Sequence, residues 1–173
     1  MDIILEELTA GLPDARQITR VIIRLVVAML LGGVVGIQRE WTGKPAGLRT
    51  HMLVALGAAL FVLAPVEAGM TSADLSRVIQ GLATGIGFIG GGAILKLSEE
   101  RDIRGLTSAA GIWMTAAMGV AVGLGRIGMA LLSALLTWFI LAVVGKIEHR
   151  IERRIIAEQA ARGDTHRTRG AVE

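Results

Sequence analysis

The chain has 173 residues, of which 53% are hydrophobic and 19% charged, with a formal net charge of +3 and a mean hydropathy of +0.60. A soluble domain of this length usually holds more charge, so the composition favours one membrane domain and leaves no room for a second folded one. The sequence contains no cysteine, which excludes a disulfide framework, a thiolate metal site and cysteine catalysis.

The basic residues lie mostly beside apolar runs, which indicates membrane orientation and lipid contact and argues against nucleic-acid binding. Residues 1–17 are acidic instead. Acidic character is atypical of a signal peptide. We predict a periplasmic segment here, either a short helix on the outer leaflet or a frayed terminus.

Five apolar runs follow in the sequence. Inside hydrocarbon each backbone N–H and C=O must be paired within its own segment, so these runs predict helices. The expected fold class is an all-α integral membrane protein with five transmembrane helices in a glycine-rich bundle over residues 18–145. Only Gly125 and Arg126 separate the last two runs, which predicts an antiparallel hairpin. The expected spans are residues 18–37, 48–65, 78–95, 106–124 and 127–144.

The lysines and arginines segregate into alternate loops. Thirteen fall in the loops 38–51 and 96–105 and in the tail from residue 146, whereas four fall on the opposite side. The positive-inside rule then places the N-terminus outside and the C-terminus in the cytoplasm. The tail 146–173 is predicted to continue the last helix along anionic lipid of the inner leaflet, and to lose order from about residue 160.

Glycines recur at spacings that let helix backbones approach closely. The segment Gly85–Gly90 also matches a dinucleotide-binding G-x-G-x-x-G, but it lies inside an apolar run without the strand that this motif needs. Packing within the chain and packing against a second copy, which would make a homo-oligomer, are both left open. The predicted packing positions are Gly32, Gly36, Gly81, Gly85, Gly87, Gly91, Gly92, Gly111, Gly119 and Gly123, with Thr115 in the same stripe as the last three.

Three polar residues are predicted to lie within the membrane. Arg24 is expected either to extend toward the outer interface or to pair with Glu67 or Asp74 of the second outer loop. Gln80 and Thr84 lie one turn apart on the third span. They are expected to bond to a neighbouring helix or to line a small polar cavity.

Polar residues also converge on the cytoplasmic ends of three spans. Two of these spans present helix N-termini there, with free N–H groups and positive partial charge. This arrangement suits an anion, a lipid headgroup phosphate or an acidic segment of a partner. Ordinary helix capping with positive-inside anchoring is the alternative. The candidate site consists of Arg39, Glu40, Arg49, Thr50, His51, Arg104, Thr107 and Ser108.

No set of residues predicts catalysis or a metal site, so the chain is not expected to be an enzyme or to hold a cofactor. Glu99, Glu100 and Asp102 offer oxygens to a hydrated Mg²⁺. Because Arg101 and Arg104 alternate with them, a solvated loop is the simpler interpretation.

Four stretches, in this order and spacing, resemble the MgtC/SapB family over about residues 20–145: LGGVVGIQRE (31–40), AGLRTHMLVALGAALF (46–61), GIGFIGGGAI (85–94) and GLTSAAGIW (105–113). The resemblance implies a five-span bacterial inner-membrane domain linked to magnesium homeostasis. Many members carry an ACT-like domain after the last span, and the 28 residues after Gly145 are too few for one. The positions that match the family's motifs are Arg39, Glu40, Gly47, Arg49, Thr50, His51, Gly87, Gly92, Arg104, Gly105 and Thr107.

Three functions are weighed. The first is a regulator that contacts another membrane protein, which the resemblance favours. The second is a small transporter or channel for Mg²⁺ or another ion, although no Asp or Glu falls within a predicted span. The third, an enzyme acting on lipid phosphate, lacks a recognisable nucleophile and base.

Overall fold

The computed structural model describes residues 14–96, 103–145 and 147. The side chains of residues 95, 96, 103 and 104 are not among those described. The chain divides into two compact units, Met1–Thr137 and Trp138–Glu173, and each is considered by itself. The expectations for residues 1–13, for the acids of the loop 97–102 and for nearly all of the tail lie outside the described residues.

The described chain is helical, as the apolar runs predict. The helices are α2 (Ala15–Trp41), α3 (Leu48–Glu67), α4 (Ser72–Gly92), α5 (Leu106–Gly123) and α6 (Ile127–Phe139), and α6 continues as a π-helical segment, Ile140–Val144. The all-α membrane fold class is confirmed, apart from two strands of two residues each.

Four helical segments of the described chain are long and apolar enough to cross a membrane, namely α2, α3, α5 and Ile127–Val144. α4 is not among them. It begins six residues before the predicted span, because the Thr71 hydroxyl accepts a hydrogen bond from the Asp74 amide at its first turn. It ends at Gly92, three residues before the predicted end. At about 1.5 Å per residue, its 21 residues still measure about 30 Å.

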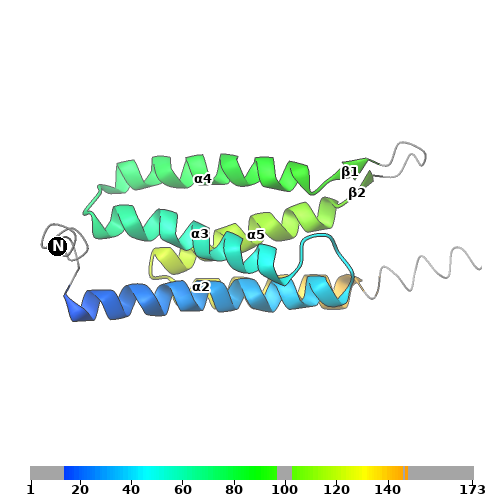
Figure 1. Ribbon diagram of the computed structural model, residues 1–173, viewed down its shortest axis with the longest axis horizontal. Helices are drawn as coiled ribbons and strands as arrows, with labels where there is room; N and C mark the ends of the chain where they lie inside the picture. The colour runs from blue at the N-terminus through cyan, green and yellow to red at the C-terminus, as the bar shows by residue number, and fades with distance from the viewer. Residues whose placement is uncertain (1–13, 97–102, 146, 148–173) are drawn as a thin grey trace, which may run out of the picture. The chain divides into compact units, whose positions relative to one another are not determined.

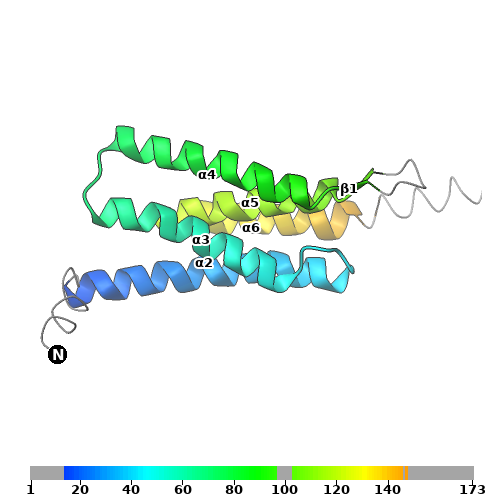
Figure 2. The same ribbon diagram turned by 45° about the horizontal axis from the view of Figure 1, so that its top comes forward.

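Within the first unit, α3 packs against α2, α5 and α4, while α5 also packs against α2 and α4. In both ribbon views α3 lies between α2 and α4 (Figures 1 and 2). The connections are short. β1 (Leu95–Lys96) and β2 (Ile103–Arg104) pair antiparallel between α4 and α5, with Leu95 opposite Arg104.

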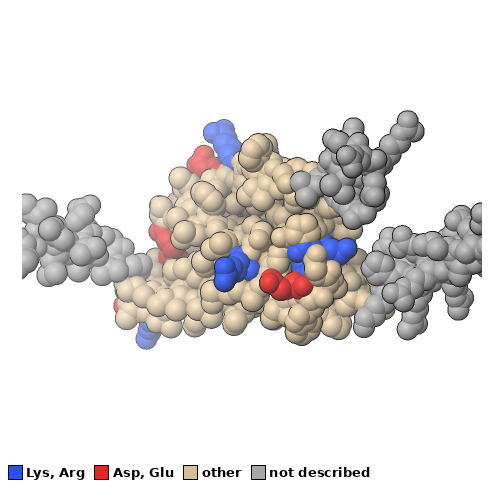
Figure 3. Space-filling model, turned by 45° about the vertical axis from the view of Figure 1, so that its right-hand side comes forward, with Lys and Arg blue, Asp and Glu red and all other residues tan. Residues whose placement is uncertain are grey.

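Small residues fill much of the helix interfaces. Ala28, Ala55, Ala59 and Ala130 are fully buried, whereas large apolar side chains such as Leu53 and Phe61 are exposed. On the face in Figure 3, charged side chains are few and uncharged residues make up most of the described surface. A bundle with small residues inside and large apolar residues outside is suited to lipid as its solvent.

Candidate functional site

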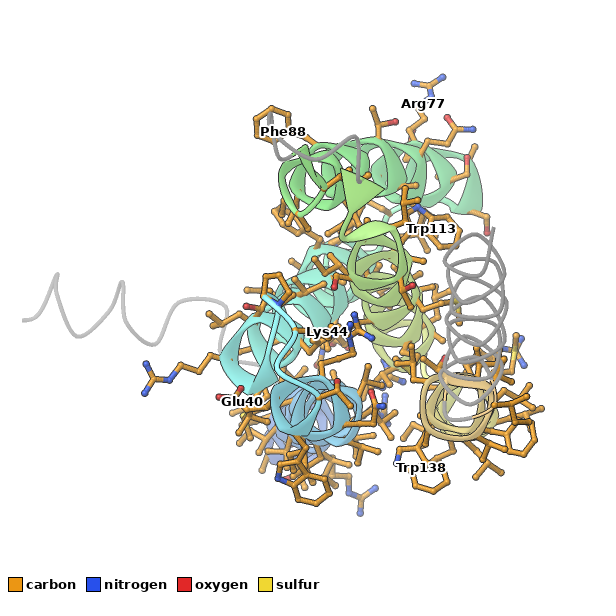
Figure 4. The ribbon with its side chains drawn as sticks, turned by 90° about the vertical axis from the view of Figure 1, so that its right-hand side faces the viewer. Glu40, Lys44, Arg77, Phe88, Trp113 and Trp138 are labelled. Carbon is orange, nitrogen blue, oxygen red and sulfur yellow. The ribbon has the colours of Figure 1, made fainter. Side chains whose placement is uncertain are left out.

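The end of α2 and the beginning of α3 are joined by a carboxylate. Glu40 Oε2 accepts a hydrogen bond of 2.8 Å from the Leu48 amide, the first of α3. A Cβ at Gly47 would overlap this carboxylate, so a larger residue there would displace the Glu40 side chain from its present position. Figure 4 shows Glu40 extending from α2 beside the beginning of α3. Glu40 therefore caps α3 from outside it and satisfies one of its free N–H groups.

Arg39, one residue earlier, points into the bundle and is only 3% exposed. It lies in the last turn of α2, where the carbonyl ends of the helix favour a positive charge. Its Nη2 donates a 2.6 Å hydrogen bond to the hydroxyl of Ser108, the third residue of α5. Its Nε, also buried, has no partner among the described residues.

His51, in the first turns of α3, is fully buried against α5. Its Nδ1 lies 2.7 Å from the Thr115 hydroxyl, and that hydroxyl donates to the Gly111 carbonyl at 2.9 Å. A Cβ at Gly111 would lie 3.5 Å from the ring carbon Cε1. His51 Nε2 is buried, and no hydrogen-bond partner for it lies in the part of the chain that the structure describes.

The buried polar cluster therefore consists of Arg39, Ser108, His51 and Thr115. Of these, the candidate site includes the first three. The sequence predicts Thr115 only as a small residue in a packing stripe. In the structure the Thr115 hydroxyl bonds the imidazole of His51. The sequence offers one indication of this role, because Thr115 follows Ser108 by seven residues and so lies on the same helix face.

Of the other candidate residues, those whose side chains are described are exposed or only partly buried. Arg49 and Thr107 are exposed, and Thr50 is partly buried. For Arg104 the structure describes only the backbone, which pairs with Leu95 in the short hairpin. The structure thus places three of the predicted side chains, those of Arg39, His51 and Ser108, in a buried group, and four others, those of Glu40, Arg49, Thr50 and Thr107, in exposed or partly buried positions.

The three polar residues predicted to lie within the membrane make one contact between helices and one within a helix. Arg24 is partly buried and its Nη1 donates to the Gly123 carbonyl at 3.1 Å, so its bond goes to the end of α5 rather than to a carboxylate. Of its two predicted partners, Glu67 accepts a hydrogen bond from Gln17 Nε2 and Asp74 accepts one from the Thr71 hydroxyl.

Gln80 and Thr84 are exposed on α4. The Thr84 hydroxyl donates to the Gln80 carbonyl at 3.0 Å, so this bond stays within the helix. It is a side-chain-to-backbone bond of the kind that serine and threonine often make one turn back along a helix.

The glycines fall into two groups. At Gly32 and Gly119 an added Cβ would overlap backbone carbonyls of α3, namely those of His51 and Ala55. At Gly36 it would lie 2.6 Å from Leu48 Cα, and at Gly123 it would lie 2.9 Å from the Ala59 carbonyl oxygen. On α4, no described atom lies within 4 Å of a Cβ added at Gly81, Gly85, Gly87, Gly91 or Gly92.

A group of three or more acids and histidines able to hold a metal ion is absent from the described residues. The chemistry that the buried cluster offers is instead that of a cationic donor, Arg39, with a hydroxyl and an imidazole nearby.

The helical fold, its apolar exterior and the buried polar cluster define a multi-pass membrane protein. The family model described as the MgtC family matches residues 25–150. The chain belongs to the MgtC family, and the resemblance inferred from its four motifs is confirmed.

Several curated proteins are similar to the chain. Protein SrpB of Synechococcus elongatus is 45% identical over 125 residues, which cover 66% of this chain and 69% of SrpB. Protein MgtC of Salmonella typhimurium strain LT2 is 42% identical over 116 residues, which cover 66% of this chain and 48% of MgtC. YhiD of Escherichia coli K12, whose name marks it as a candidate magnesium transporter, is 37% identical over 137 residues.

The matched stretch covers 75% of this chain and 63% of YhiD. The chain thus corresponds to about half to two thirds of the length of several relatives. No solved structure matches it.

Proposed function

We propose that this chain is a magnesium-linked regulator of the bacterial inner membrane, which acts by contacting another membrane protein and not by conducting Mg²⁺. The link to magnesium is supported by the name of the relative YhiD. The choice of a regulator over a conductor is supported by the charge of the buried cluster.

The observation that carries the proposal is the buried guanidinium of Arg39, which is 3% exposed between α2 and α5. Mg²⁺ keeps much of its hydration and is held in proteins by carboxylate and other oxygens. Arg39 places a positive charge inside the bundle, where a low dielectric strengthens its repulsion of a cation. Glu40, the nearest acid in sequence, is exposed and caps α3 instead.

The exposed surface of α4 supports a protein contact. Beside the large apolar Phe88 and Ile89, it presents small or polar residues, among them Gln80, Gly81, Thr84 and Gly85, whereas the large apolar residues that α6 exposes include Leu132 and Leu135. Large apolar side chains suit lipid, and small or polar ones suit a neighbouring helix. In Figure 4, Arg77 and Phe88 of α4 point away from α3 and α5.

An apolar groove of about 430 Å³ adjoins this surface between α3 and α4. Two of the exposed glycines, Gly81 and Gly85, form part of its lining together with Phe61 of α3 and Ile86 of α4. The groove and the α4 surface together offer one continuous place for a helix of another membrane protein.

Reconstituted protein tests the choice between regulator and conductor. Proteoliposomes with a fluorescent Mg²⁺ indicator inside are expected to show no saturable Mg²⁺ influx above protein-free vesicles. Arg39→Gln removes the buried charge and serves as the comparison. Saturable influx through the wild-type protein would overturn the proposal in favour of a transporter, the alternative that the name of YhiD favours.

Photo-cross-linking in native membranes tests the contact. A photoreactive residue at Thr84 is expected to give one discrete adduct with a different membrane protein, while the same residue at Leu132, on the exposed face of α6, is expected to label lipid only. Lipid labelling alone at both positions, or an adduct with only a second copy of this chain, would contradict the proposed partner. A second experiment compares how much of the partner membrane protein is captured by the Arg49→Ala variant and by the Arg77→Ala variant. Both arginines are exposed but lie at opposite ends of the bundle.

A further inference from the structure

The charge of Arg39 is not balanced by any acid in the described part of the chain. Within the described residues, its side chain donates a hydrogen bond to a neutral hydroxyl, that of Ser108. Glu40 bonds the Leu48 amide, while Glu67 and Asp74 bond Gln17 and Thr71 at the other end of the helices. A buried charge without a counter-charge is costly, and the carbonyl end of α2 offsets only part of that cost.

The surroundings of Arg39 add further positive potential. Ser108 belongs to the first turn of α5, whose N–H groups have no partner within the helix. The N-cap residue of α5 is Gly105, which has no side chain to bond these groups. Arg39 therefore lies where the positive end of a helix dipole and a guanidinium act on the same small volume.

His51 supplies an acceptor beside these donors. In the tautomer in which the ring donates from Nδ1 to the Thr115 hydroxyl, that hydroxyl donates to the Gly111 carbonyl and His51 Nε2 keeps its lone pair. Ser108, Gly111 and Thr115 are spaced three and four residues apart, so they share one face of α5. Arg39 and His51 thus lie at successive levels along that face, each with one buried nitrogen that has no partner in the described chain.

We propose that this cluster binds a phosphate group that retains one hydrogen, either inorganic phosphate or the monoester headgroup of a lipid such as phosphatidate. The Arg39 Nε–H and the first N–H groups of α5 donate to the phosphate oxygens, as arginines and helix N-termini do elsewhere. The P–OH donates to His51 Nε2. Near neutral pH a phosphate monoester exists partly in its singly protonated form, whereas sulfate and a phosphodiester have no such hydrogen to donate.

The inference draws on the same buried charge of Arg39 as the function proposed above, but the two proposals fail separately, because a Mg²⁺ conductor could hold the same anion site. Mg²⁺ influx into proteoliposomes would overturn the regulator and leave the phosphate site standing. Loss of the phosphate site would leave the regulator standing.

Binding is measured on the full chain in detergent, as a saturable rise of the unfolding temperature with inorganic phosphate, because a ligand that binds only the folded state stabilises it. Sulfate at the same ionic strength is the matched anion. Vesicles with phosphatidate and vesicles with phosphatidylglycerol at equal surface charge distinguish the lipid source. Stabilisation by phosphate alone assigns the free anion, and retention of the protein by phosphatidate but not by phosphatidylglycerol vesicles assigns the lipid.

Arg39→Lys is expected to weaken phosphate binding about tenfold, which corresponds to about 1.4 kcal/mol, because lysine keeps the charge but loses the guanidinium geometry. Arg39→Gln should abolish binding. Arg49→Gln is the matched control, since it removes the same charge from an exposed arginine at the same end of the bundle, and its phosphate affinity should stay within about twofold.

If Arg39→Gln does not fold, Arg39→Lys decides the question. Equal effects of phosphate and sulfate together with equal retention by both kinds of vesicle would overturn the proposal, and so would equal losses of binding in the Arg39 and Arg49 variants.

Discussion

The contact between Gly119 and α3 leaves no space for even one methyl group. A Cβ at Gly119 would overlap the Ala55 carbonyl oxygen and lie 2.8 Å from the Ala58 Cβ. Backbone atoms cannot rotate away as a flexible side chain can, so a larger residue must separate α3 from α5.

We therefore expect Gly119→Ala to lower the free energy of unfolding by about 1–3 kcal/mol, the usual cost of overpacking a tight interface. Gly57→Ala is the control, because nothing lies within 4 Å of a Cβ at that position in α3. It should leave stability unchanged or raise it by up to about 1 kcal/mol through better helix propensity. Unfolding in detergent followed by circular dichroism measures both, and equal losses in the two variants would contradict the interpretation.

The residue types of the buried cluster are predictable from the sequence, but their burial is not. Arg39 and Arg49 are the same kind of residue at facing helix ends, yet one is buried against Ser108 and the other is exposed. His51 and Thr115 are 64 residues apart in the chain. Which of two equivalent arginines turns inward depends on how the helices rotate when they pack, and no local pattern contains that information.

Three of the helices end in the same way. After α5, the amide of Gly125 bonds the Val122 carbonyl and that of Arg126 bonds the Ala121 carbonyl, with Gly125 at a φ of +77°. This is the Schellman motif, in which a left-handed residue closes the helix. Gly43 and Gly69, both at positive φ, close α2 and α3 with the same pair of bonds.

Gly125→Ala is expected to reduce stability by about 1–2 kcal/mol, since a Cβ is disfavoured at this φ. The new methyl group would also lie 2.6 Å from Arg24 Nη2 and displace the guanidinium that bonds the Gly123 carbonyl. Gly128→Ala, in the first turn of α6 and with open space around it, is the comparison. A thermal unfolding midpoint that falls only for Gly125→Ala would support the role of the turn, and an equal fall in both would rule it out.

The elements themselves follow closely from the sequence, because four of them are apolar runs of nearly the length that a bilayer requires. α4 is the exception. Asp74 and Arg77 interrupt its apolar pattern, so the predicted span starts after them, whereas the structure begins the helix at the Thr71 cap. Hydropathy measures the cost of leaving water and does not register a hydrogen bond that starts a helix six residues earlier.

The positive-inside rule predicts on which side of the membrane each end of α4 lies. If α4 crosses the membrane, its two ends face opposite sides. Because the chain has no native cysteine, single cysteines can report this directly. Lys44→Cys, before α3, and Ser98→Cys, after α4, should react with a membrane-impermeant thiol reagent only after the cells are opened.

Ser72→Cys, at the start of α4, should react in intact cells. Reaction of Ser72→Cys and Ser98→Cys from the same side would show that α4 does not cross, and the bundle would then have four spans. Reversed accessibility at all three positions would show that the charge count assigns the wrong orientation.

The close contacts of α3 have a mechanical consequence. Gly32 and Gly36 hold its backbone against α2, and Gly119 and Gly123 hold it against α5, each at a separation that admits no side chain. Sliding or rotating α3 would drive its carbonyls into a helix on one side or the other. The helices α2, α3 and α5 should therefore move as one rigid body. A conformational change in the first unit would then have to be a displacement of α4 relative to these three helices.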